Sequence, residues 1–116
     1  MKLLNEARFE EMFYADIIQK VWEKGAVVHG YDPSKWRKDF AGAWIKRDLY
    51  GTNQGYGWVI DHLRPRNAGG TDALENLAPL HWRNNTVKAA DYPTFVTEVS
   101  SEGNENVERR RRWLIP

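Results

Sequence analysis

The chain has 116 residues, the usual size of one domain, so we expect a single hydrophobic core. Apolar residues make up 41% of the sequence and aromatic residues 13%, which excludes wholesale disorder. The 17 Lys and Arg nearly balance the 16 Asp and Glu, and the formal net charge is +1. Gross basicity is therefore excluded as an argument for nucleic-acid binding, and only local patches can support it.

The chain contains no cysteine, which excludes disulfides, thiolate nucleophiles and cysteine-ligated zinc. Its apolar runs are much shorter than the roughly 20 residues that a membrane helix needs. The residues after Met1 become polar too early for a signal peptide. We therefore expect a cytoplasmic protein with no membrane segment.

The first segment is predicted to be a helix, because its apolar side chains recur at helical spacing. They form one stripe: Phe9, Met12, Phe13, Ile17, Ile18, Val21 and Trp22. Asn5 is a candidate cap at its start, and Gly25 stands where a helix-ending glycine is common. The stripe is expected to pack in the core or against another copy of the chain, and we assign it no chemistry.

Turn signals follow, and among them Asp32-Pro33 is typical of a short helix or a single turn. Residues 35–47 carry five Lys or Arg, including Lys46 and Arg47, against one Asp, and two tryptophans lie among these charges. One interpretation is a solvated face over buried indoles. The other is a surface that binds phosphates, and the two interpretations are equally well supported.

The remaining chain alternates β-branched or aromatic runs with turn residues. We expect strands at 43–47, 58–62 and 95–100, a brief extended piece at 77–81, a loop at 64–70, a helix at 82–90 and a turn at 101–104. The four arginines at 109–112 suit a nucleic-acid contact and a disordered, solvated end equally well.

Asp61 and His62 stand at the end of one predicted strand, where it breaks into a loop. A carboxylate is a hard oxygen ligand suited to Mg²⁺ or Mn²⁺. An imidazole is the side chain best suited to take a proton from water at physiological pH. Asn85, in the first turn of the next predicted helix, could complete a metal site. Taken alone, an Asp-His pair is more often a local hydrogen-bonded pair without a catalytic role.

The context of this pair resembles the HNH endonuclease family, whose sites use the ββα-metal fold. The resemblance rests on several elements together: Asp61-His62, Pro65, Gly69-Gly70, Asn76-Leu77, Asn85 and Lys88. It implies one α+β domain over the whole chain, with three regions. These are an N-terminal helix and turn region (1–42), an HNH ββα-metal core (43–90) and a C-terminal β-hairpin with a basic tail (91–116).

The resemblance also implies roles for the site residues. His62 would be the general base, and Asp61 and Asn85 would bind one divalent ion, Mg²⁺ or Mn²⁺. Asn76 would tie the loop together and hold the imidazole. The implied activity is metal-dependent hydrolysis of phosphodiester bonds in DNA by a one-metal mechanism. The alternative is a nucleic-acid-binding module that keeps the fold without turnover.

Three cations near the pair are candidate phosphate contacts, Arg64, Arg66 and Lys88, with loop solvation or a structural role as alternatives. The family's second zinc-binding cysteine pair would fall at His81 and Asn84, so we expect no structural zinc. Burial of three indoles is expected to take its place, those of Trp44, Trp58 and Trp82.

A chain this short has little surface for sequence recognition. Specificity is therefore expected to come from a homodimer or from a larger nuclease, phage or restriction assembly.

Overall fold

The structure is a computed structural model that describes residues 2–115, with side chains from residue 12 onward. Helix α1 (Lys2–Trp22) confirms the predicted N-terminal helix. It begins before Asn5, so the prediction that Asn5 marks its start is wrong, and the side chains of Asn5 and Phe9 lie outside the described part. The helix ends near Gly25, whose N–H donates to the Trp22 carbonyl at 2.9 Å.

Three two-stranded antiparallel sheets follow α1 in chain order. They pair β1 (Trp36–Lys38) with β2 (Trp44–Lys46), β3 (Trp58–His62) with β4 (Leu77–His81), and β5 (Thr94–Glu102) with β6 (Glu105–Leu114). Short 3-10 turns lie at Arg47–Leu49, Arg66–Ala68 and Leu74–Asn76. Strand β1 lies in a region for which we expected only turns.

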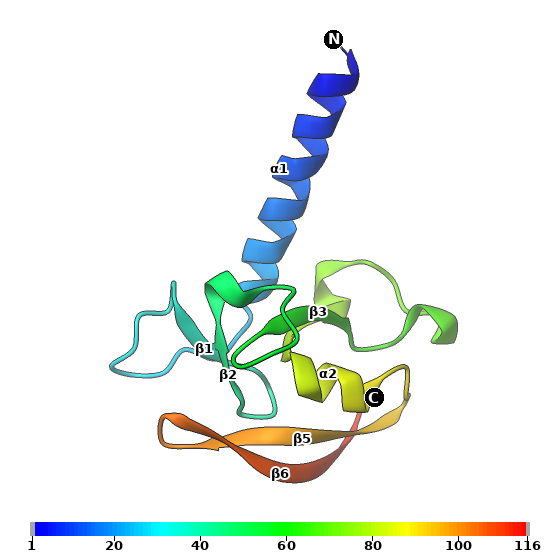
Figure 1. Cartoon of the computed structure of the whole chain (residues 1–116). Helices are drawn as coiled ribbons and strands as arrows, with labels where there is room; N and C mark the ends of the chain where they lie inside the picture. Colours follow the sequence, from blue (N-terminus) through cyan, green and yellow to red (C-terminus); the bar gives the residue numbers. More distant parts are fainter. Residues whose placement is uncertain (1, 116) are drawn as a thin grey trace.

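Helix α2 (Trp82–Lys88) begins directly after β4, so β3, β4 and α2 follow one another in ββα order. Both strands coincide with the predicted segments, whereas the helix ends two residues earlier than expected. α2 contacts β3 and β4 on one side and β5 on the other (Figure 1). The chain is therefore α+β, with the C-terminal hairpin covering the ββα unit.

The core forms where the end of α1 meets the β2, β3 and β4 strands. Its fully buried cluster consists of Val21, Trp22, Ile45, Trp58 and Leu77. The rings of Trp22 and Trp58 pack with their centroids 5.3 Å apart. The earlier turns of α1 extend away from this body (Figure 1). Within the described residues, no helix is both long and apolar enough to cross a bilayer.

The arginines at 109–112 lie within β6. The interpretation of this run as a disordered, solvated end is therefore wrong. Two of the arginines pair with acidic residues of the same hairpin. Arg109 lies 2.8 Å from Glu102, and Arg110 lies 3.6 Å from Glu98. Strand pairing orders this segment, and two neighbouring glutamates pair with two of its four arginines.

Candidate active site

One open cavity of about 340 Å³ lies between the end of β3 and helix α2. Its lining includes Asp61 and His62 from β3, Asn85 from α2 and Arg66 from the loop that joins β3 to β4. Successive residues of a regular strand point to opposite faces. Asp61 and His62, the last two residues of β3, nevertheless both line this cavity.

Asp61 is buried beside a cation. The Nζ of Lys88, which is fully buried, lies 3.2 Å from Asp61 Oδ2 and donates to the His62 carbonyl at 3.1 Å. Burial raises the pKa of the Asp61 carboxyl, and the positive charge of Lys88 opposes that shift. Lys88 faces the protein interior. Of the two roles predicted for it, this favours a structural role over a phosphate contact.

His62 contacts a carboxylate that the sequence analysis did not single out. Its Nε2 lies 2.8 Å from Oδ1 of Asp72, and Arg66 donates to the same oxygen from Nε at 3.0 Å. These hydrogen bonds, that of His62 first, lower the pKa of the Asp72 carboxyl. The only signal in the sequence was an acidic residue directly after the Gly-Gly-Thr of the loop, and its spacing from His62 did not reveal the contact.

Asn76 holds the loop by three hydrogen bonds. Its Oδ1 accepts from the Arg64 N–H at 2.9 Å, and its Nδ2 donates to the carbonyls of Arg64 at 3.0 Å and Thr71 at 2.7 Å. Within the described residues, none of these bonds reaches the imidazole, which contacts Asp72 instead. A catalytic contribution of Asn76 stays a prediction.

Lys46 and Arg47 lie away from this cavity. The Arg47 guanidinium lies over the Trp58 ring, at 6.0 Å from its centroid, and the Lys46 ammonium over the Trp36 ring at 5.6 Å. Trp58 begins the strand that His62 ends, and at about 3.3 Å per residue their backbones are roughly 13 Å apart. These two cations therefore form a separate surface near the β1–β2 hairpin.

Arg64 lies closer to the site but is engaged by its own loop. Its Nε donates to the Ala68 carbonyl at 2.7 Å, and its guanidinium lies over the Tyr92 ring at 5.4 Å. The contacts to Ala68 and Tyr92 hold the guanidinium against the protein, so Arg66, the cation that lines the cavity, is the better placed of the two for a phosphate.

A buried carboxylate joins the β1–β2 turn to the ββα unit. Asp39, 3% exposed, accepts four N–H donors at 2.9 to 3.1 Å. Two are backbone donors of its own turn, from Ala41 and Ala43, and two belong to His81 (backbone) and Asn84 (side chain). The sequence analysis missed Asp39, because its partners at the β4–α2 junction lie more than 40 residues further along the chain.

Asn84 extends this cluster to the C-terminal hairpin. Its Oδ1 accepts from the backbone N–H of Glu98 and Val99, and its Nδ2 donates to the Val99 carbonyl. The resemblance places a zinc-binding cysteine pair at this position. Here hydrogen bonds of Asn84 link the elements instead. Trp82, which was expected to help by burial, is only partly buried, whereas Trp58 is fully so.

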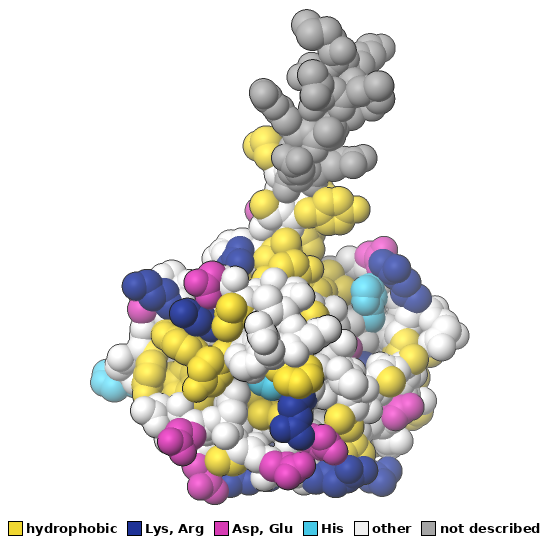
Figure 2. Space-filling model, in the orientation of Figure 1, with side chains coloured by type: hydrophobic (Ala, Val, Ile, Leu, Met, Phe, Trp, Pro, Cys, Tyr) yellow, Lys and Arg dark blue, Asp and Glu magenta, His cyan; other side chains and the backbone are white. Residues whose placement is uncertain are grey.

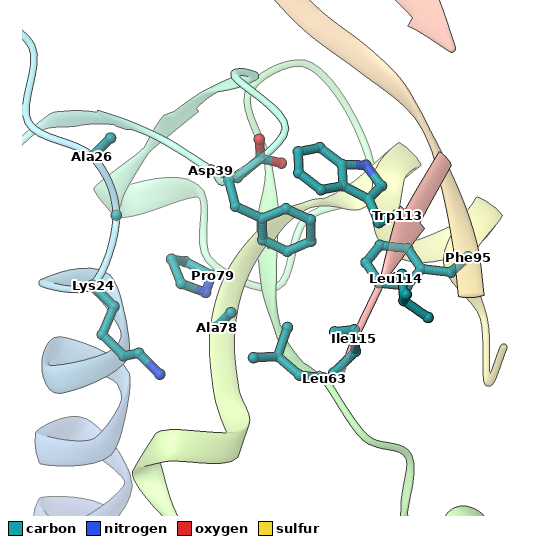
Figure 3. Close-up of a pocket in the computed structure, with 12 residues that line it drawn as sticks. Lys24, Ala26, Asp39, Leu63, Ala78, Pro79, Phe95, Trp113, Leu114 and Ile115 are labelled. Carbon is teal, nitrogen blue, oxygen red and sulfur yellow. The ribbon is translucent and has the colours of Figure 1, made fainter. Parts of the chain in front are cut away.

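A second and larger cavity, of about 520 Å³, lies on the other side of β4 and is mostly apolar (Figure 3). Lys24 stands on one side of it, with Phe95 and Trp113 on the other (Figure 3). It contains none of the predicted catalytic or metal-binding residues, whereas Asp61, His62 and Asn85 line the smaller cavity.

Residues 47–90 match the family described as HNH endonuclease. The matched segment contains β3, β4 and α2 together with the residues that line the smaller cavity. It confirms the resemblance found in the sequence. No curated protein and no solved structure matches the chain.

Replacing Lys88 by Met should destabilise the fold strongly, because the Asp61 carboxylate would remain buried without its cation. We expect a loss of about 3–5 kcal/mol in the free energy of unfolding, measured by urea denaturation at pH 7. The control is Lys20→Met, which breaks an exposed pair with Asp16 at 3.0 Å and should cost less than about 0.5 kcal/mol. Equal, small losses in both variants would contradict the assignment.

Asp39 and His81 should give opposite pH dependences of stability. Burial raises the pKa of Asp39 to about 6, against its hydrogen bonds, and burial lowers the pKa of His81 to about 4. The contribution of Asp39 to stability is fully present below pH 3.8, its ordinary pKa, and is lost as the pH rises through 6. The contribution of His81 to stability is fully present above pH 6.5, its ordinary pKa, and is lost as the pH falls through 4.

Between pH 4 and 6 these two contributions should cancel in the wild type. Relative to the wild type, His81→Gln should therefore lose stability as the pH rises across this range, and Asp39→Asn should gain it. Each slope should approach 1.4 kcal/mol per pH unit, measured by chemical denaturation at pH 4, 5 and 6. Slopes of the same sign in both variants would refute the assignment.

Proposed function

We propose that this chain, which carries an HNH endonuclease segment at residues 47–90, hydrolyses phosphodiester bonds of DNA with the help of one divalent ion. The observation that supports it most is the shared cavity, which the β3 residues Asp61 and His62 line together with Asn85 of α2. A base and two oxygen ligands are the groups that this reaction needs.

The donor set fits Mg²⁺ or Mn²⁺. Asp61 Oδ2 is buried and accepts no hydrogen bond, with only the Lys88 ammonium beside it at 3.2 Å, and among the described residues the Asn85 side-chain amide makes no hydrogen bond. Mg²⁺ takes oxygen ligands and keeps several of its waters, so a carboxylate and an amide are sufficient protein ligands. Bound there, the ion would stabilise negative charge on the phosphate and on the leaving 3′ oxygen.

The protein side chains supply the rest of the proposed reaction. His62 takes a proton from the attacking water, since an imidazole does this well near neutral pH. Arg66, with 70% of its side chain exposed at the cavity, offers positive charge to the DNA backbone. Asn76 ties together the two ends of the loop that carries Arg66, by its hydrogen bonds to the carbonyls of Arg64 and Thr71.

A second candidate function is nucleic-acid binding without cleavage. Its support is the cationic and aromatic surface on the β1–β2 hairpin, where Lys38 lies over Trp44 at 4.8 Å and Lys46 over Trp36 at 5.6 Å. This surface could hold a phosphate backbone without any contribution from the cavity.

Nicking of supercoiled plasmid DNA in Mg²⁺ or Mn²⁺ tests the proposed function. We expect cleavage that EDTA abolishes, and a loss of about 100-fold or more in rate for His62→Ala. The matched control is His29→Ala, because His29 is exposed and lies outside the cavity. Absence of nicking with every divalent ion, or equal nicking by His62→Ala, would reject the enzyme, and salt-sensitive DNA binding would then favour the second function.

We also propose that α1 pairs with a second copy of the chain. Met12, Phe13 and Tyr14 are 72%, 54% and 64% exposed, although the next turn of the helix packs on the core. Apolar side chains gather at this part of the helix (Figure 2). Consecutive helix residues do not share one face, so only part of this apolar surface can be buried against one partner helix. The contact is therefore smaller than a standard interface and suits a weak dimer.

Light scattering after size-exclusion chromatography should therefore show dimerisation that increases with protein concentration. Phe13→Glu should abolish it, since a charge would be placed in the apolar contact. Lys20→Met, which changes a charged position on the same helix, should not. A monomer at every concentration would contradict the dimer.

A further inference from the structure

We infer that Asp72 is a positioning residue, which holds the His62 ring so that Nδ1, and not Nε2, takes the proton from the attacking water. This inference rests on the proposed function and adds a residue that neither the sequence pattern nor the family match assigns. Asp72 lies ten residues after His62, in the loop between β3 and β4.

The hydrogen bond determines which ring nitrogen is free. A carboxylate can only accept, so Nε2 at 2.8 Å from Asp72 Oδ1 must carry the hydrogen. The bonds from His62 and Arg66 lower the pKa of Asp72, which keeps it ionised. A neutral imidazole with its hydrogen on Nε2 has its lone pair on Nδ1, and this nitrogen becomes the base.

Arg66 contacts the same carboxylate oxygen of Asp72 as His62 does. Its Nε and Nη2 lie 3.0 and 2.9 Å from the same Oδ1 that contacts His62. The carboxylate of Asp72 is 69% exposed, so burial does not hold it in place. The orientation of His62 therefore depends on this Arg66–Asp72 pair and on the conformation of the loop.

The conformation of the loop between β3 and β4 brings Asp72 back to the end of β3. Gly70 makes this possible, because a Cβ at that position would lie 1.7 Å from the Arg64 carbonyl oxygen. Asn76 then fastens the residue next to Asp72, since its Nδ2 donates to the Thr71 carbonyl at 2.7 Å. The close approach and the amide contact together place Asp72 opposite the imidazole.

In the proposed hydrolysis step, one bond to phosphorus forms and one breaks, and each proton has an acceptor or a donor. A water oxygen forms a bond to phosphorus while the bond from phosphorus to the 3′ oxygen breaks, and the leaving oxygen takes a proton from solvent. The proton of the attacking water goes to Nδ1 of His62. The resulting imidazolium keeps its Nε2 hydrogen on Asp72, whose negative charge stabilises it.

Two measurements on Asp72→Ala test the inference, with Asp48→Asn as the control because Asp48 lies outside the cavity. In steady-state cleavage, kcat should fall about 10- to 100-fold while KM changes less than about twofold, and Asp72→Glu should recover part of the loss. In the metal-free protein, the ¹⁵N chemical shifts of the neutral His62 ring should report the Nε2–H form, and Asp72→Ala should reduce its population.

The two readouts separate this inference from the proposed function. A wild type that does not cut DNA would reject the function and with it the catalytic part of the inference, and the ring tautomer would then test only whether Asp72 holds the Nε2–H form. An active wild type with unchanged kcat in Asp72→Ala would overturn the inference, as would a wild-type ring whose hydrogen is on Nδ1. Asp48→Asn should match the wild type in both measurements.

Discussion

A buried ammonium group connects the two elements on which the candidate site depends. Lys88, at the end of α2, reaches back to Asp61 and to the carbonyl of His62 on β3. Since Asn85 lies one turn earlier on α2, this contact also determines where its amide stands relative to Asp61. A buried charge needs a partner, so the helix and the strand cannot separate without exposing or orphaning one of the two ions.

The unit that carries the site is held together without cysteine. In its place Asp39 accepts four N–H donors and Asn84 spans from Asp39 to strand β5. Each polar atom of this cluster is paired, which is the condition under which buried polar groups are tolerated. The C-terminal hairpin thus belongs to the support of the site, although the family match ends before it begins.

Much of the local structure could be predicted from composition along the chain. The 58–62 strand has β-branched and aromatic residues bounded by turn signals, and it was found as expected. Strand β1 was missed because its three residues lie among turn residues and are stabilised by pairing with β2. The run at 109–112 was ambiguous, because charge alone does not tell a solvated end from an edge strand.

The sequence by itself indicated the candidate reaction, because the segment that contains Asp61, His62 and Asn85 resembles the HNH endonuclease family. Only the tertiary structure decided their surroundings: Lys88 on Asp61, Asp72 on His62, and Asp39 beneath the helix start. The physical reason is that such contacts depend on where a loop returns and on which groups become buried together. Neither property is encoded in the spacing of a few residues along the chain.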